Sequence, residues 1–171
     1  QKPGYIPGSL EYGVMDSNMV GIIAAMTTCG TLTSVDFSNC NFGPKAVIEF
    51  AKFIPAMAVL NSLKCANNPG MVGELWGNGT LKTPDVHVDV FKQLTDGLKP
   101  SQVTEVDFSS CGIGPVALGH LSDWVREATA AVNSLTIDST GDMRNCKTYT
   151  LTAGEEKVDL SGKTLGPADV A

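Results

Sequence analysis

VDFSNCNFGPKA, Val35 to Ala46, decides the fold of this chain because the same stretch occurs three times in 171 residues. It returns as VDFSSCGIGPVA at Val106 to Ala117 and as VDLSGKTLGPAD at Val158 to Asp169. Each copy opens on a hydrophobic-Asp-hydrophobic-Ser run and reaches a hydrophobic-Gly-Pro run after a variable segment. Self-similarity of this kind predicts an array of repeated structural units.

Each copy has the composition of a short strand, a turn and the start of a helix. Val35 and Phe37 are two residues apart, so in a strand both side chains point to one side and become core. Asp36 and Ser38 then point to the opposite side. The Gly-Pro pair supplies a flexible turn and then a fixed φ at the first helical position, which predicts a helix from Pro44.

Two weaker copies alternate with the strong ones, LNSLKCANN at Leu60 to Asn68 and VNSLTIDST at Val132 to Thr140. In the first weak copy Cys65 falls on the core side of the expected strand. Asn68 takes the place that Cys40 and Cys111 hold in the strong copies. The alternation of VDFS and NSL units predicts about five strand units.

The apolar spacing of the strong copies is LxxLxLxxCxL. It is formed by Leu32, Val35, Phe37, Cys40 and Phe42, and again by Val103, Val106, Phe108, Cys111 and Ile113. This spacing resembles the leucine-rich repeat family, and the cysteine is typical of its ribonuclease-inhibitor-like class. The resemblance implies an α/β solenoid with a curved parallel sheet inside and helices outside. It also implies that Cys40, Asn68 and Cys111 form a buried structural ladder.

Two segments break the regular pattern. The stretch near 70–83 is a Gly-rich insertion, after which Thr83-Pro84-Asp85 predicts the start of the next helix. The stretch near 138–154 has no helical pattern and contains the strand-like run TYTLT. The chain has the ordinary length of one domain, so we expect residues 1–171 to form a single domain, and its third copy reaches only Ala171. That domain would be a segment of a longer array, or one whose open end a partner covers.

Composition argues against several classes of function. The net charge of −6 disfavours nucleic acid and anionic membranes, which select basic surfaces. No apolar run reaches the roughly 18 residues of a membrane span, so we expect no membrane insertion. Five cysteines without a CxxC pair disfavour a zinc site and a disulfide framework. Free thiols favour the cytoplasm, with secretion as the alternative.

Chemistry-bearing motifs are missing from the sequence. It contains no GxxxxGK[ST] phosphate loop, no recognisable catalytic triad and no metal-ligand spacing. We therefore expect no cofactor, no metal and no enzymatic activity.

The outward residues of stacked parallel strands would form polar columns on one face. The columns are mildly acidic and carry small side chains, which suits a protein partner with a basic surface. These residues have two interpretations: they bind a partner on the concave strand face, or they belong to the repeat and hold loops and neighbouring strands. The predicted partner-binding residues are Asp36, Ser38, Lys64, Glu105, Asp107, Ser109, Asp138 and Asp159.

The insertion near 70–83 offers two further candidates. Trp76 is either an exposed aromatic anchor for a partner or a hydrophobic plug that folds back over the repeats. Asn78-Gly79-Thr80 is a glycosylation sequon, so Asn78 would carry a glycan if the protein is secreted.

The sequence therefore predicts a protein–protein interaction scaffold. One alternative is a structural subunit that stacks repeat units into a homo-oligomer, a filament or a larger assembly. A second alternative is a GTPase-regulating protein, because this architecture also resembles leucine-rich repeat proteins of that kind. That role requires a constellation of arginine or asparagine, whereas Arg126 and Arg144 fall in unrelated segments.

Overall fold

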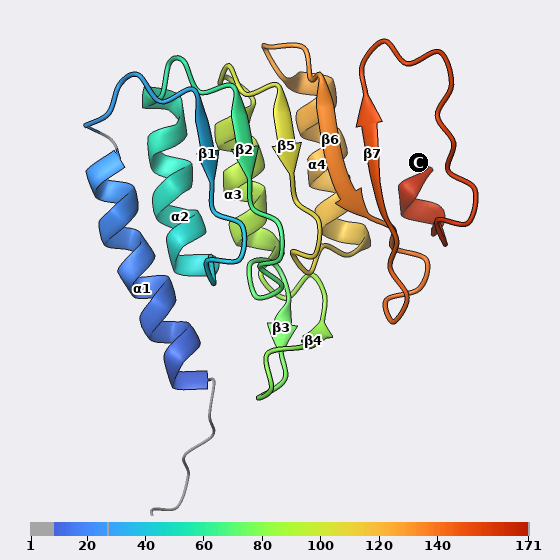
Figure 1. Ribbon diagram of the computed structural model, residues 1–171, viewed down its shortest axis with the longest axis horizontal. Helices are drawn as coiled ribbons and strands as arrows, with labels where there is room; N and C mark the ends of the chain where they lie inside the picture. The colour runs from blue at the N-terminus through green and yellow to red at the C-terminus, as the bar shows by residue number, and fades with distance from the viewer. Residues whose placement is uncertain (1–8, 27, 171) are drawn as a thin grey trace, which may run out of the picture.

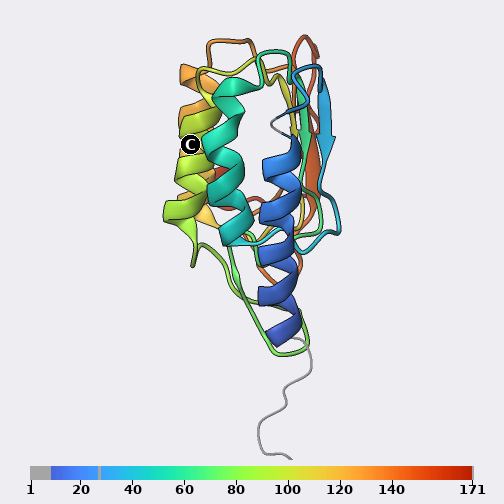
Figure 2. The ribbon, with the colours of Figure 1, turned by 90° about the vertical axis from the view of Figure 1, so that its left-hand side faces the viewer.

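The computed structural model describes residues 9–26 and 28–170, which form a layer of helices against one face of a sheet (Figures 1 and 2). The helices are α1 (Ser9–Met26), α2 (Pro44–Phe53), α3 (Val88–Leu98) and α4 (Pro115–Glu127), with the short 3₁₀ turns η1 (Ile54–Ala56) and η2 (Pro167–Asp169). Each helix packs beside the one before it in the chain. In the described part of the chain, no helix combines the length and the apolar character needed to cross a bilayer.

The main sheet has five strands in the order β1-β2-β5-β6-β7. Their bounds are β1 (Ser34–Asp36), β2 (Ser62–Lys64), β5 (Glu105–Asp107), β6 (Ser134–Asp138) and β7 (Thr148–Thr152). The first four strands are parallel, and β7 pairs with β6 in the antiparallel direction. A two-stranded hairpin, β3 (Glu74–Leu75) and β4 (Leu81–Thr83), lies in the predicted insertion. The expected mixed α/β class with a mainly parallel sheet is confirmed.

The core lies between the sheet and the helices, where the alternating sequence predicts it. Val35, Leu63, Val106 and Leu135 occupy paired positions in neighbouring strands, and none is more than 8% exposed. Each of these side chains leaves water on the helix side of the sheet. Complete burial of an aliphatic side chain of this size contributes about 1.5–3 kcal/mol to folding.

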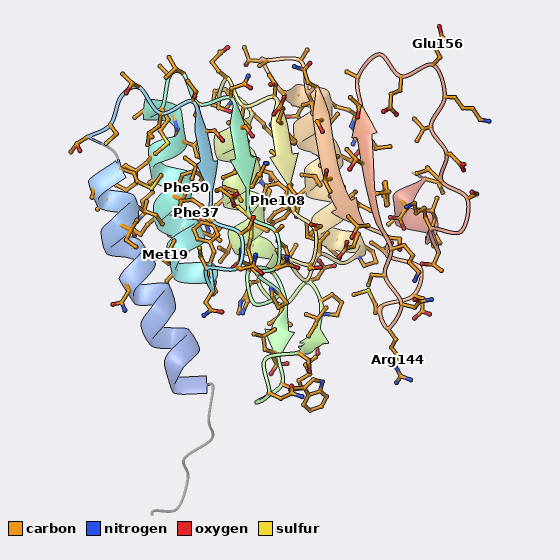
Figure 3. All side chains as sticks on the ribbon, viewed as in Figure 1. Met19, Phe37, Phe50, Phe108, Arg144 and Glu156 are labelled. Carbon is orange, nitrogen blue, oxygen red and sulfur yellow. The ribbon has the colours of Figure 1, made fainter. Side chains whose placement is uncertain are left out.

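Aromatic rings fill the space between the first strand and the second helix. The Phe37 and Phe42 rings stack with centroids 4.5 Å apart, and Phe50 of α2 meets Phe37 edge-on at 5.2 Å. Figure 3 labels Phe37 and Phe50 beside α2 and β1, with Phe108 further along the sheet. Trp124 of α4 is fully buried, as its place in the apolar pattern of that helix predicts.

The strong copies share one turn geometry after their VDFS or VDLS run. Positive φ occurs at the fourth and the sixth residue after the valine in every copy, at Asn39, Asn41, Ser110, Gly112, Gly162 and Thr164. Glycine is required at Gly112, since a Cβ there would lie 2.5 Å from the Pro69 carbonyl oxygen. Asparagine tolerates positive φ better than most residues, which suits the first copy.

The position of the fifth strand differs from the expectation. Val158–Leu160, the valine-led start of the third copy, forms no strand, and TYTLT supplies β7 instead. The repeat pattern predicts Val158–Leu160 beside β6, and TYTLT occupies that edge with a longer ladder. TYTLT pairs with β6 over five residues, whereas the strong copies form strands of only three residues.

The predicted helix start at Thr83-Pro84-Asp85 is also wrong, because α3 begins at Val88. The Asp85 carboxylate caps the neighbouring helix α4 instead of its own. It accepts the backbone N–H groups of Gly114 at 2.8 Å, Val116 at 2.8 Å and Ala117 at 3.2 Å. A carboxylate at a helix N-terminus satisfies orphan donors and the positive end of the dipole.

Candidate partner-binding face

The face of the main sheet opposite the helices carries the outward side chains of all five strands. We call this surface the open face. Each of its side chains below carries a hydroxyl group or a charge, and each is exposed or half-buried. The open face consists of Ser34, Asp36, Ser62, Lys64, Glu105, Asp107, Ser134, Thr136, Asp138, Thr148, Thr150 and Thr152.

The columns on the open face follow the predicted register through four strands. Strand pairing places Asp36 beside Lys64, Lys64 beside Asp107, and Asp107 beside Thr136. A second column places Ser34, Ser62, Glu105 and Ser134 side by side. The predicted place of Asp159 in the first column is wrong, because Asp159 lies outside the sheet and Thr150 takes the fifth place.

The aspartates of the strong copies hold the turns that follow them. The Ser38 N–H donates to Asp36 Oδ1 at 2.8 Å, and the Ser109 N–H donates to Asp107 Oδ1 at 3.0 Å. The third copy repeats this contact between Ser161 and Asp159 at 2.9 Å. Hydrogen bonds from Ser38 lower the pKa of Asp36, and hydrogen bonds from Ser161 lower that of Asp159. These carboxylates therefore have a structural role in addition to any role in binding.

Asp138 connects the end of β6 to the loops on both sides. Its Oδ2 accepts the Ser110 N–H at 2.8 Å and its Oδ1 accepts the Thr148 hydroxyl at 2.6 Å. The open face then carries four carboxylates, those of Asp36, Glu105, Asp107 and Asp138, and the ammonium group of Lys64. Among the described residues Lys64 forms no ion pair with Asp36 or Asp107, although the strand register places it between them. The surface is net acidic.

The predicted ladder residues are all hydrogen-bonded inside the turns. Asn68 is fully buried; its Nδ2 donates to the carbonyls of Phe37 at 2.9 Å, Cys65 at 2.7 Å and Ala66 at 3.3 Å. Its Oδ1 accepts the Phe42 N–H at 2.9 Å. One amide thus joins the turn after β1 to the turn after β2.

The cysteines of the turns are structural in their contacts. The Cys111 thiol donates to the Cys65 carbonyl at 2.9 Å, and the Cys40 thiol lies 3.4 Å from the Ser38 carbonyl oxygen. Burial raises the pKa of Cys65 and of Cys111, so neither thiol ionises readily. Such cysteines pack as small apolar groups.

Trp76 stands on the β3–β4 hairpin, which projects beyond the carboxyl ends of the parallel strands (Figure 1). Its side chain is 56% exposed, so the plug alternative is wrong for this residue; Met71 and Val72 supply the buried contacts of the insertion. Lys82 Nζ lies 5.3 Å from the Trp76 ring centroid and 2.9 Å from Glu74 Oε1. The hairpin therefore presents an exposed aromatic ring next to a lysine that is itself paired with Glu74.

The sequon lies at the tip of the same hairpin. The Asn78 side-chain oxygen accepts the Thr80 N–H at 3.1 Å and the Thr80 hydroxyl at 2.7 Å, and both residues are exposed. Asn78 is accessible for modification, which remains conditional on secretion.

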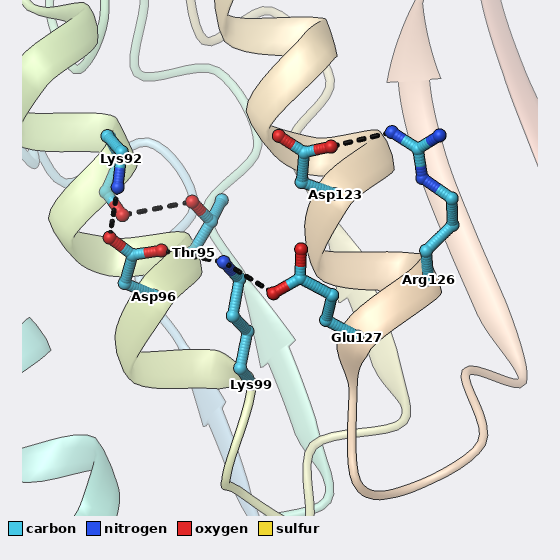
Figure 4. Close-up of polar contacts among 7 residues, drawn as sticks. All are labelled: Lys92, Thr95, Asp96, Lys99, Asp123, Arg126 and Glu127. Carbon is cyan, nitrogen blue, oxygen red and sulfur yellow. Dashed lines mark hydrogen bonds and ion pairs between the residues drawn. The ribbon is translucent and has the colours of Figure 1, made fainter.

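Charged groups also gather on the outer face of the helices, away from the open face (Figure 4). Asp96 contacts Lys92 and Lys99, and Lys99 reaches Glu127 of α4 at 3.1 Å. Hydrogen bonds from the two lysines lower the pKa of Asp96. Exposed pairs of this kind contribute little to stability and weaken with salt.

Two carboxylates that organise the second half of the chain were not predicted. Asp85 caps α4, and Asp169 accepts hydrogen bonds from the Thr140 N–H and hydroxyl, the Gly166 N–H and the Tyr149 hydroxyl, at 2.7–2.9 Å. The signal for Asp169 was present, since the third copy ends in GPAD where the others have GPKA and GPVA.

The scan of protein-family models and the searches of curated proteins and of solved structures found no match to this chain.

Proposed function

We propose that the chain is a leucine-rich repeat protein of the ribonuclease-inhibitor-like class that binds a protein partner on its open face. The repeat assignment rests on the shared turn geometry of the three strong copies. The Asp-Ser contact and both positive φ positions recur in each of them. The buried Asn68 and Cys111 contacts between successive turns also support a stacked array.

The observation that carries the binding proposal is the charged, uncovered surface of the sheet. Glu105 is exposed, and no hydrogen bond or ion pair of the described chain engages its carboxylate. Together with Asp36, Asp107 and Asp138 it gives the open face an acidic field. A basic protein surface would be attracted to this field and would gain charge complementarity on docking.

The test is a change of charge that preserves the turns. Asn can replace Asp36 and Asp107 as a turn acceptor, and Lys replaces the free Glu105, so the triple variant D36N/E105K/D107N changes the charge of the open face and keeps the turn acceptors. We expect a partner captured by the native chain to bind the variant about tenfold or more weakly. Quantitative crosslinking or capture with mass spectrometry, followed by titration of the purified partner, measures this change.

The matched control makes the same change in net charge elsewhere. Asp89→Asn, Glu155→Gln and Glu156→Lys lie outside the open face, and all three residues are exposed. Partner affinity should be retained in this variant. Equal weakening by both triple variants would assign the effect to overall charge and would contradict binding on the open face.

Self-association is a second candidate because α4 has an open groove on its side facing η2. The groove has a volume of about 440 Å³ and is lined by Val116, Leu118, His120 and Ala168, among others. Val116 is 56% exposed. Light scattering after size exclusion over a hundredfold range of concentration distinguishes the two functions. A rise in mass that Val116→Lys abolishes favours self-association, and a constant monomer mass contradicts it.

GTPase regulation gains no comparable support, because Arg126 pairs with Asp123 on α4.

A further inference from the structure

The turn after β5 contains a backbone N–H and a backbone carbonyl without a hydrogen-bond partner among the described residues. The equivalent two groups of the first copy, in the turn after β1, both have a partner. In the first copy, the Phe37 carbonyl and the Phe42 N–H both bind the Asn68 amide, each at 2.9 Å. Their counterparts are the Phe108 carbonyl and the Ile113 N–H. Within residues 9–26 and 28–170, no hydrogen bond uses either group. Phe108 is 1% exposed and Ile113 is 6% exposed.

The two turns share both positive-φ positions, so we expect the two groups to face equivalent points in space. Asn39 and Ser110 have φ of 58° and 53°, and the sixth residue after the valine is also positive in both copies. The cysteines of the two turns also have equivalent contacts. The Cys111 thiol lies 3.5 Å from the Ser109 carbonyl oxygen, and the Cys40 thiol lies 3.4 Å from the Ser38 carbonyl oxygen. An amide placed like that of Asn68 would therefore meet both Phe108 and Ile113.

The chain itself does not supply this amide. Thr140 stands at the position in the second weak copy that Asn68 occupies in the first. Its N–H and its hydroxyl both bind the Asp169 carboxylate, at 2.9 and 2.7 Å. No side chain of the turn after β6 therefore does for the turn after β5 what Asn68 does for the turn after β1.

A pocket of about 290 Å³ lies at this point. Phe108 and Ile113 line it together with Gly112, and its walls include Leu81 of β4 and Met143 of the β6–β7 loop. Both the β3–β4 hairpin and the β6–β7 loop extend past the carboxyl ends of the strands (Figure 1). The pocket holds more than the volume of one asparagine or glutamine side chain and opens beside Asp138, a member of the open face.

We propose that this pocket, the amide pocket, binds a side-chain carboxamide of the protein partner, from an asparagine or a glutamine. The carboxamide oxygen accepts the Ile113 N–H, and its NH₂ group donates to the Phe108 carbonyl. The contact repeats what Asn68 does inside the chain. The inference rests on the proposed function only for the source of the carboxamide, and it adds a specific residue type to a surface otherwise described by charge.

The pairing of one donor with one acceptor selects among small polar groups. A carboxylate or a ketone can accept the Ile113 N–H but offers nothing to the Phe108 carbonyl. Leaving a buried carbonyl without a donor costs about as much as a lost hydrogen bond, so such groups should bind about fivefold or more weakly than a carboxamide.

Titration of the ¹⁵N-labelled chain with propionamide tests the amide pocket without any partner. We expect a saturable shift of the Ile113 N–H resonance, with smaller shifts for the neighbouring Gly112. Butan-2-one, which has the same shape but no donor, and propionate should give the same shift only at about fivefold or higher concentration. An Ile113 resonance that does not move, or that responds equally to the three probes, overturns the inference.

A blocking variant provides the second measurement. Met143→Trp should fill the pocket and abolish the propionamide response, while Val125→Trp, at an exposed position of α4 outside both the pocket and the α4 groove, should leave it unchanged. Leu81→Trp serves if the first variant does not fold. Loss of the propionamide response with charge-dependent partner capture intact overturns the amide pocket alone. Capture that is insensitive to D36N/E105K/D107N, with the response intact, overturns the proposed function alone.

Discussion

Replacing Asn68 with alanine is expected to lower the free energy of unfolding by about 3–5 kcal/mol. The substitution removes the amide that joins the first two turns and leaves the Phe42 N–H and the Phe37 and Ala66 carbonyls without this partner. Because Asn68 is fully buried, water cannot take over these contacts without opening the turns. Urea unfolding followed by circular dichroism measures the change as a lower midpoint at an unchanged slope.

Asn61 offers a matched control of the same residue type. It is exposed, and its side chain donates to the Thr104 hydroxyl at 2.9 Å. Asn61→Ala should cost no more than about 1 kcal/mol, because water replaces the lost partner. Similar losses in the two variants would contradict the view that Asn68 joins the turns.

Replacing Asp169 with alanine is expected to cost about 2–3 kcal/mol at neutral pH and much less at pH 2. Burial alone would raise the pKa of Asp169, but hydrogen bonds from Thr140, Gly166 and Tyr149 outweigh it and lower the pKa below 3.8. A carboxyl group whose pKa is lowered by folding stabilises the fold at pH values above its pKa in the unfolded chain. This stabilisation is lost as the pH falls through its pKa in the folded chain. Stability curves of the native chain and the variant should therefore converge in acid.

Tyr149 provides the complementary test at alkaline pH. Burial, together with its hydrogen bond to Asp169, raises the pKa of Tyr149 above its ordinary value of 10.0. A raised tyrosine pKa stabilises the fold below pH 10, and this stabilisation is lost as pH rises through the folded value. Tyr149→Phe should flatten the alkaline limb of the curve of unfolding free energy against pH and leave most of its acid limb in place.

For Asp169→Ala, an acid limb that is unchanged from the native chain would show that the Asp169 carboxylate does not govern acid stability.

The regular part of the fold could be predicted because its signals are local. Val35 and Phe37 alternate with Asp36 and Ser38, and that alternation alone fixes which side of the strand is buried. The register across the first four strands follows from the same repeat, so the neighbours of Lys64 were predicted from spacing. Asn68 was predicted as a ladder residue for the same reason.

The remaining features depend on contacts between distant segments. The Val158 copy shares the valine-led start and the Gly-Pro pair of the Val106 copy, with Lys163 in place of the cysteine, yet TYTLT and not this copy pairs with the edge of β6. Asp85 has the sequence context of a cap for α3, yet its carboxylate reaches the N-terminus of α4, which lies near it in space. The amide pocket could not be predicted from either copy alone, because it depends on what Thr140 binds instead.

The reversed direction of β7 gives the sheet two unlike ends. One edge strand, β1, belongs to the series of parallel strands, and its free side is the side on which a further parallel strand would pair. At the other edge that series stops, because β7 runs against β6 and meets it through an antiparallel ladder. Copies placed in line and in the same orientation, β1 against β7, would meet through an antiparallel pair, unlike the parallel pairs that join β1, β2, β5 and β6. The regular step from one parallel strand to the next therefore holds from β1 to β6 and does not continue across the β7 edge.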